Sequence, residues 1–137
     1  MKIDNEQAIS TSNGDYELIR VKDSFIGSKE FEKIVNEQLE TCKKVLCSKA
    51  KEYATEDRLH NFKTAANLEN CTPIGALGGM MAKHTVSVYD MINGTNEGFE
   101  YPMELWNEKI TDSMNYLILL KALVIEENNM EVEENDC

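Results

Sequence analysis

Arginine and proline are scarce in this 137-residue chain, which has two of each and a formal net charge of −11. Proteins that bind the phosphate backbone of duplex DNA displace its condensed counterions with arginine and lysine, and an acidic chain does this poorly. About half of the excess negative charge lies after residue 125, so the remainder of the chain is only mildly acidic. We therefore expect no duplex-DNA partner.

Paired cysteine motifs and long apolar runs are also absent from the sequence. Its four cysteines form no CxxC pair and no secretion signal is recognisable, which predicts reduced thiols in the cytoplasm and no disulfide framework or zinc ribbon. No apolar run approaches the ~20 residues that cross a bilayer. The motifs GxSxG, P-loop and GxGxxG do not occur either. We expect a cytoplasmic protein with no membrane partner.

What the chain does contain is apolar residues in steps of three and four, typical of amphipathic helices. We expect an all-α fold, an antiparallel bundle of about four helices in one domain, spanning 28–127. The helices are expected at about 28–53, 57–68, 73–93 and 103–127. Before them, 1–27 should form an arm or small hairpin that turns at Asn13-Gly14, and 128–137 an acidic, disordered tail.

Each long helix has an apolar row that we expect to be buried. These rows are Phe31, Val35, Leu39, Cys42, Leu46, Ala50 and Tyr53; Leu77, Met80, Met81, His84, Val88, Met91 and Ile92; and Trp106, Ile110, Met114, Leu117, Leu120 and Val124. Asp57 and Thr72 are the expected caps of the second and third helices. Rows this long on helices of about 25 residues also predict a homo-oligomer.

The fourth helix carries a polar stripe of Glu108, Asp112 and Asn115, spaced i, i+4 and i+7 and bracketed by Leu105 and Leu119. An isolated charge facing the interior is unfavourable unless it is paired or bound to a cation. Two carboxylates and an amide are hard oxygen ligands suited to Mg²⁺. A structural ion pair is the alternative, with three candidate cations, Lys49, Arg58 and Lys109.

Two further groups of polar residues accompany this stripe. On the third helix, Lys83, Ser87 and Asp90 share one face beside His84, which could be a core histidine or a ligand. The other group spans a helix end and the next helix start, where free N–H groups attract anions; it comprises Lys51, Glu52, Tyr53, Asp57, Arg58, Asn61 and Phe62. Its basic residues could meet phosphates or form a solvated face, and its aromatic rings could stack on a base or belong to the core.

Three strings, KEYATEDRLHNFKTAANL, KHTVSVYD and EKITDSMNYLILLKAL, lie in this order between about residues 49 and 127. Together they resemble a phage and prophage family described as nucleotide-modification-associated. More distantly, they are similar to all-α MazG-like nucleoside triphosphate pyrophosphohydrolases, whose paired carboxylates hold Mg²⁺ on the triphosphate. The chain departs from that pattern, because its acidic spacing is ExxxD and no clear ExxE partner is found.

The resemblance implies a nucleotide-handling protein. The first hypothesis is that the protein is a Mg²⁺-dependent pyrophosphohydrolase. In this hypothesis Glu108 and Asp112 bind the metal with Glu52 or Asp57, and Asp90 is a further ligand or the base. The expected nucleotide contacts are Lys51, Tyr53, Arg58, Asn61, Phe62, Lys83, His84, Ser87 and Asn115. One alternative is a non-catalytic sponge that sequesters a nucleotide or cyclic nucleotide signal. Another is a protein-interaction module that inhibits a host protein.

Overall fold

The computed structural model describes residues 6–10, 16–20, 25–52 and 56–135, with side chains in 25–49 and 56–129. The chain divides into two compact units, residues 1–36 and 37–137. The boundary falls inside the first helix, α1, which spans Ser28–Glu52.

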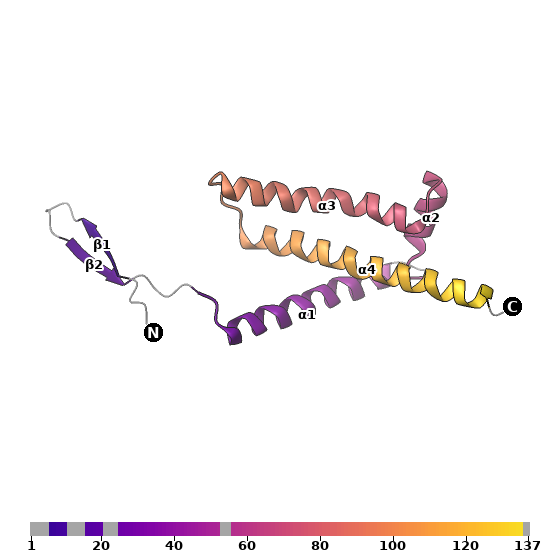
Figure 1. Cartoon of the computed structure of the whole chain (residues 1–137), viewed down its shortest axis with the longest axis horizontal. Helices are drawn as coiled ribbons and strands as arrows, with labels where there is room; N and C mark the ends of the chain where they lie inside the picture. The colour runs from indigo at the N-terminus through magenta and orange to yellow at the C-terminus, as the bar shows by residue number, and fades with distance from the viewer. Residues whose placement is uncertain (1–5, 11–15, 21–24, 53–55, 136–137) are drawn as a thin grey trace. The chain divides into compact units, whose positions relative to one another are not determined.

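The first unit contains a β-hairpin, which confirms the hairpin expected in the N-terminal segment. Strand β1, Glu6–Ser10, pairs antiparallel with β2, Tyr16–Arg20, in a register that places Glu6 opposite Arg20. The expected turn at Asn13-Gly14 lies outside the described residues. Figure 1 shows the two strands as a ribbon of their own.

The second unit is all-α, as expected for the body of the chain. It contains the rest of α1, together with α2 (His60–Glu69), α3 (Pro73–Asn96) and α4 (Met103–Asn135). Helices α3 and α4 run antiparallel side by side, and α2 packs on α3 (Figure 1). Among the described residues no helix is long and apolar enough to cross a membrane.

Local signals explain where the helices of the second unit begin. The Thr72 hydroxyl accepts a hydrogen bond from the backbone N–H of Gly75 at 3.0 Å, and Pro73 is the first helical residue of α3, which confirms this predicted start. Helix α2 begins at His60 and not at Asp57, because Asp57 stabilises the preceding turn by accepting from the backbone N–H of Leu59 at 2.9 Å.

Helix α4 continues to Asn135, eight residues beyond its expected end at 127. Residues 128–135, assigned from the sequence to the acidic tail, are therefore helical in backbone conformation. Neither glycine nor proline interrupts this segment, and glutamate and methionine are good helix formers. A high density of acidic residues does not by itself end a helix.

The connection between α3 and α4 folds back on the end of α3. The backbone N–H of Phe99 donates to the carbonyl of Gly94 at 2.9 Å, and Gly94 is buried. A Cβ atom on Gly94 would collide with the Tyr101 hydroxyl, so glycine is required there as long as Tyr101 keeps this position. The Tyr101 ring also meets Trp106 edge to face, with ring centres 6.1 Å apart.

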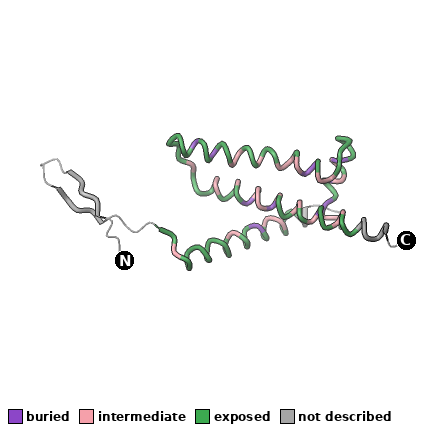
Figure 2. Tube along the Cα trace, in the orientation of Figure 1, coloured by how far each residue is buried: buried purple, intermediate pink, exposed green. Residues whose placement is uncertain are grey.

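The hydrophobic core of the second unit joins three of its elements. Leu59 and Phe62 from the α2 segment, Leu77 from α3 and Leu123 from α4 form one buried cluster. Leu77 and Leu123 are 0% and 1% exposed. Figure 2 shows buried positions, in purple, on α3 and α4. A dry apolar contact of this kind is the main favourable term that holds the helices together.

The expected core rows are wrong in part, and α4 shows this best. Leu117 and Val124 of its expected row are 56% and 40% exposed, whereas Thr111, Asn115 and Leu123 are buried. Helix α4 has apolar residues around most of its circumference, so periodicity alone could not choose the buried face.

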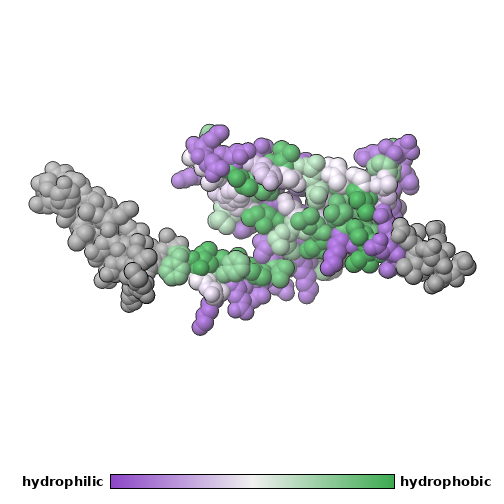
Figure 3. All heavy atoms as spheres, in the orientation of Figure 1, coloured by the Kyte–Doolittle hydropathy of each residue, from purple (hydrophilic) through white to green (hydrophobic). Residues whose placement is uncertain are grey.

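The same correction applies to the first half of α1. Phe31, Val35 and Leu39, expected to be buried, are 61%, 39% and 53% exposed, while Cys42 of the same row is buried. Apolar side chains gather along this helix in Figure 3. The expected homo-oligomer would give such a row a partner, and it stays a prediction.

Candidate functional site

A cavity of about 130 Å³ lies within the second unit, between its helices. It is lined by Val45, Leu46 and Lys49 of α1; Arg58, Asn61 and Phe62 at the start of α2; Met80 of α3; and Asp112, Asn115, Tyr116 and Leu119 of α4. The cavity therefore combines apolar and aromatic walls with a few polar groups, which is the usual make-up of a small-molecule site.

Asn115 is the most informative residue of this cavity. Its side chain is buried, with the residue only 6% exposed, and neither Nδ2 nor Oδ1 has a hydrogen-bond partner in the described part of the chain. Leaving a buried polar group unpaired costs about 1–3 kcal/mol, so such groups are rare in folded proteins. An amide held in this state on a cavity wall points to a ligand that completes its hydrogen bonds.

One other buried polar atom shares this condition within the described residues, the hydroxyl oxygen of Ser113. Ser113 does not line the cavity. Asn115 is therefore distinguished by the combination of burial, two unpaired atoms and a place on the cavity wall.

Asp112, one turn before Asn115, is held by a neighbour on α3. Its Oδ2 lies 3.4 Å from His84 Nδ1, and the side chains are 24% and 18% exposed. The His84 ring also packs on Tyr116, with ring centres 4.8 Å apart. His84 thus positions two cavity residues without lining the cavity itself, which is the structural role considered for it from the sequence.

The cationic groups of the cavity come from α1 and from the segment before α2. Lys49 is exposed, whereas Arg58 is partly buried and its Nη2 donates to the backbone carbonyl of Leu46 at 3.4 Å. This contact fixes Arg58 against α1. The two side chains give this wall of the cavity a local positive charge, although the protein as a whole is acidic. A local positive charge favours an anionic ligand.

The structure brings together five of the residues expected from the sequence at this cavity, Arg58, Asn61, Phe62, Asp112 and Asn115. Sequence reasoning missed the apolar wall, formed by Val45, Leu46, Met80, Tyr116 and Leu119. Their apolar or aromatic character does not distinguish them, in the sequence, from ordinary core residues.

Glu108 does not join Asp112 at the cavity. Its carboxylate is 58% exposed and accepts a hydrogen bond from Lys109 Nζ at 2.8 Å. That hydrogen bond, with the positive charge of the lysine, lowers the pKa of Glu108. The ion-pair alternative weighed for the acidic stripe therefore describes Glu108.

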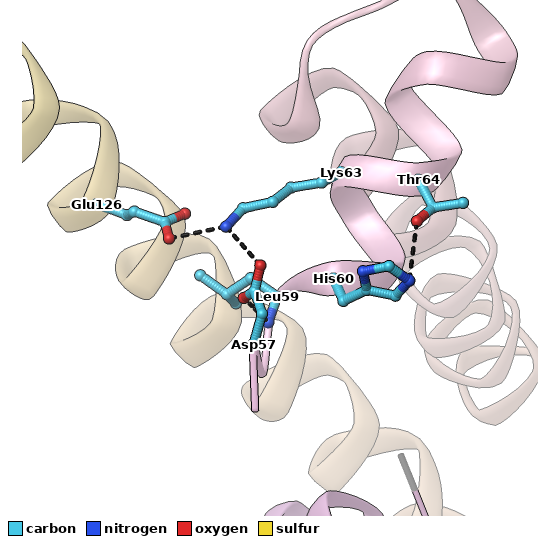
Figure 4. Close-up of polar contacts among 6 residues, drawn as sticks. All are labelled: Asp57, Leu59, His60, Lys63, Thr64 and Glu126. Atoms are coloured by element: carbon cyan, nitrogen blue, oxygen red, sulfur yellow. Dashed lines mark hydrogen bonds and ion pairs between the residues drawn. The ribbon is translucent and has the colours of Figure 1, made fainter. Parts of the chain in front are cut away.

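Asp57 is likewise engaged away from the cavity (Figure 4). Lys63 Nζ donates to Asp57 Oδ2 at 2.7 Å and to Glu126 Oε1 at 2.8 Å, so one ammonium links the start of α2 to α4. The hydrogen bond from Lys63, followed by that from the Leu59 N–H, lowers the pKa of Asp57. The hydrogen bonds to Asp57 and Glu126 raise the pKa of Lys63.

The remaining expected residues whose side chains the structure describes do not line the cavity. Lys83 and Asp90 are exposed on α3, and the Ser87 hydroxyl donates to the backbone carbonyl of Lys83 at 2.9 Å, within its own helix. The side chains of Lys51 and Glu52, and the whole of Tyr53, lie outside the described residues.

No protein-family model matches this chain, and neither a curated protein nor a solved structure is found to match it. The resemblance to nucleotide-modification-associated and MazG-like proteins therefore stays a prediction.

The cavity offers few protein ligands for a resident Mg²⁺ ion. Asp112 is the one carboxylate among its lining residues. Across the described side chains, no three of His, Cys, Asp and Glu are grouped as metal ligands would be. The Mg²⁺ cofactor expected from the sequence is thus a prediction without a described ligand cluster.

Proposed function

We propose that this protein binds a nucleotide or a nucleotide-derived small molecule in the cavity between α1, α2 and α4. The observation that carries the proposal is Asn115, whose buried amide has no partner among the described residues and lies on the cavity wall. A bound ligand would supply the missing hydrogen bonds and remove the desolvation penalty of the amide.

The surroundings of Asn115 favour a nucleotide among small ligands. Phe62 and Tyr116 offer aromatic surface on which a base can stack, and stacking contributes about 1–3 kcal/mol per base. Lys49 and Arg58 provide cations for phosphate, and guanidinium groups bind phosphate through paired hydrogen bonds. A ligand with a flat polar ring and an anionic group matches the aromatic surface, the cations and the unpaired amide of Asn115.

Binding is better supported than turnover. The pyrophosphohydrolase implied by the resemblance relies on paired carboxylates to hold its metal, and of the expected ligands whose side chains the structure describes, only Asp112 lines the cavity. Glu108 and Asp57 are instead engaged by Lys109 and Lys63. The sponge hypothesis needs no metal and uses the cavity as it stands.

The test is calorimetric titration of the folded protein with nucleoside mono-, di- and triphosphates and cyclic dinucleotides, with Mg²⁺ and with EDTA. We expect binding by the wild type and its loss in Asn115→Leu, while Asn107→Leu, an exposed position of the same helix, binds normally. Ligand recovered after denaturation should be unchanged by mass spectrometry. Failure of every nucleotide to bind at millimolar concentration would refute the proposal, and recovery of a monophosphate from a triphosphate would show an enzyme instead.

A further inference from the structure

We infer that the Asn115 side chain hydrogen-bonds to the base of the bound nucleotide and that this base is a pyrimidine. The inference rests on the proposed function, and it assigns each end of the ligand to a part of the cavity. It follows from the chemistry of the two unpaired amide atoms and from the size of the space beside them.

The two unpaired atoms of Asn115 have opposite requirements. Nδ2 carries hydrogens to donate and Oδ1 has lone pairs to accept, and this holds whichever way the amide is turned. Phosphate oxygens mainly accept hydrogen bonds and would leave Oδ1 unpaired, whereas a metal ion would bind Oδ1 and leave Nδ2 unpaired. A single group with a donor and an acceptor side by side satisfies both atoms at once.

The edge of a nucleobase is such a group. An asparagine side chain pairs with an adjacent donor and acceptor in a bidentate manner, as it does with adenine in protein–DNA complexes. The ring nitrogen and exocyclic amine of cytosine, or the ring N–H and carbonyl of uracil, present the same pattern. Hydrogen bonding therefore selects a base at Asn115 but does not choose between one-ring and two-ring bases.

The size of the cavity favours a one-ring base over a two-ring base. Its volume is about 130 Å³, and a cavity of roughly 150 Å³ in a protein core holds one benzene molecule. One six-membered ring fills the space, so a purine would leave its second ring without enclosing walls. Phe62 lines the cavity and also belongs to the packed core, and Met80 and Leu119 pack against that core, so these walls have little freedom to move apart for a larger ring.

The phosphate of the ligand is then assigned to the cationic wall. Lys49 is exposed, and Arg58 is held against the backbone of α1 by its bond to Leu46. Asn115 lies deeper, being 6% exposed. A pyrimidine nucleotide can thus place its uncharged ring inside and its charged group near water, which avoids the desolvation of the phosphate.

The inference is tested by titrating the protein with CMP, UMP, AMP, GMP, cytidine, uridine and inorganic phosphate in EDTA. We expect CMP and UMP to bind at least about tenfold more tightly than AMP and GMP, because the second ring of a purine exceeds the cavity, and misfits of this size in a pocket cost about tenfold or more in affinity. The free nucleosides should bind measurably, and inorganic phosphate more weakly than either monophosphate. In wild-type protein, CMP should shift the side-chain amide resonances of Asn115 in a nitrogen–proton NMR spectrum.

Asn115→Asp keeps the shape of the side chain and removes its donor, so it should lose about tenfold or more in affinity for CMP. Asn107→Asp is the matched control on the exposed face. Purine nucleotides binding as tightly as pyrimidine nucleotides, or an Asn115 resonance unmoved by bound CMP, would overturn this inference and leave nucleotide binding intact. Absence of binding by all four monophosphates, with the larger nucleotides also failing, would overturn the proposed function itself.

Discussion

The interior of residues 37–137 has two adjoining parts that share Phe62. In one part, Phe62 packs with Leu59, Leu77 and Leu123, which are all apolar. In the other, it lines a cavity whose wall contains the unpaired amide of Asn115. The first part stabilises the fold, and the second gives up stability to keep a polar group available. The unsatisfied buried amide on the cavity wall is the basis on which we propose that the second part binds a ligand.

The largest expected effect comes from the core side of this comparison. Leu77→Ala should lower the free energy of unfolding by about 2–5 kcal/mol, because Leu77 is fully buried and its removal leaves a cavity. Urea denaturation followed by circular dichroism measures the change. Leu68→Ala, at a position 83% exposed, is the control and should change stability by less than about 0.5 kcal/mol. Equal effects at both positions would contradict the described core.

A substitution at the cavity should have the opposite effect on the free energy of unfolding. Asn115→Leu is expected to raise the free energy of unfolding of the ligand-free protein by about 1 kcal/mol, since it removes an unsatisfied amide and adds apolar contact. The same denaturation experiment checks this. A decrease of similar size would mean that the amide is needed for the fold, and the comparison between the two parts would fail.

A smaller effect is expected at the ion pairs that join α2 to α4. Lys63→Met removes the bonds to Asp57 and Glu126 and should lower stability by about 0.5–1 kcal/mol, a modest amount because these side chains are 35–39% exposed. Thermal unfolding at low and high salt measures the loss, which should shrink as salt screens the charges. Lys109→Met, which breaks the pair with the exposed Glu108, should have less effect and serves as the control.

The smallest effect is the pH dependence of that contribution. The pKa of Asp57 is lowered, so its stabilisation is present above the ordinary value of about 4 and is lost as pH falls through the lowered value. The pKa of Lys63 is raised, so its share is present below about 10.4 and is lost as pH rises through the raised value. The stability difference between wild type and Lys63→Met should therefore be constant between about pH 5 and 9 and decline below pH 4. A difference that grew on acidification would show another origin.

Local signals in the sequence predicted most of the helical fold. The Thr72-Pro73 start of α3 and the hairpin were both expected, since capping and strand patterns act over a few residues. The buried face of α4 was not predictable in the same way. Leu117 and Leu123 are equally apolar, and only packing against α3 and the α2 segment decides that Leu123 is buried.

The candidate site was predictable to a similar degree. The stripe through Asp112 and Asn115 faces inward as expected, but the sequence could not show that Glu108 turns to solvent and pairs with its neighbour Lys109. Nor could it show that the amide, and not the carboxylate pair, is the unsatisfied group. Hydrogen-bond satisfaction depends on atoms brought together by folding, and spacing along one helix does not contain it.

The close contact of Gly94 with the Tyr101 hydroxyl has an evolutionary consequence. The two positions share one small volume, so a mutation that adds a side chain at 94 is tolerated only with a smaller residue at 101. Homologous chains that keep the short connection between α3 and α4 should therefore vary at these positions as a pair. An alignment of such homologues should show glycine at the first position wherever tyrosine occupies the second.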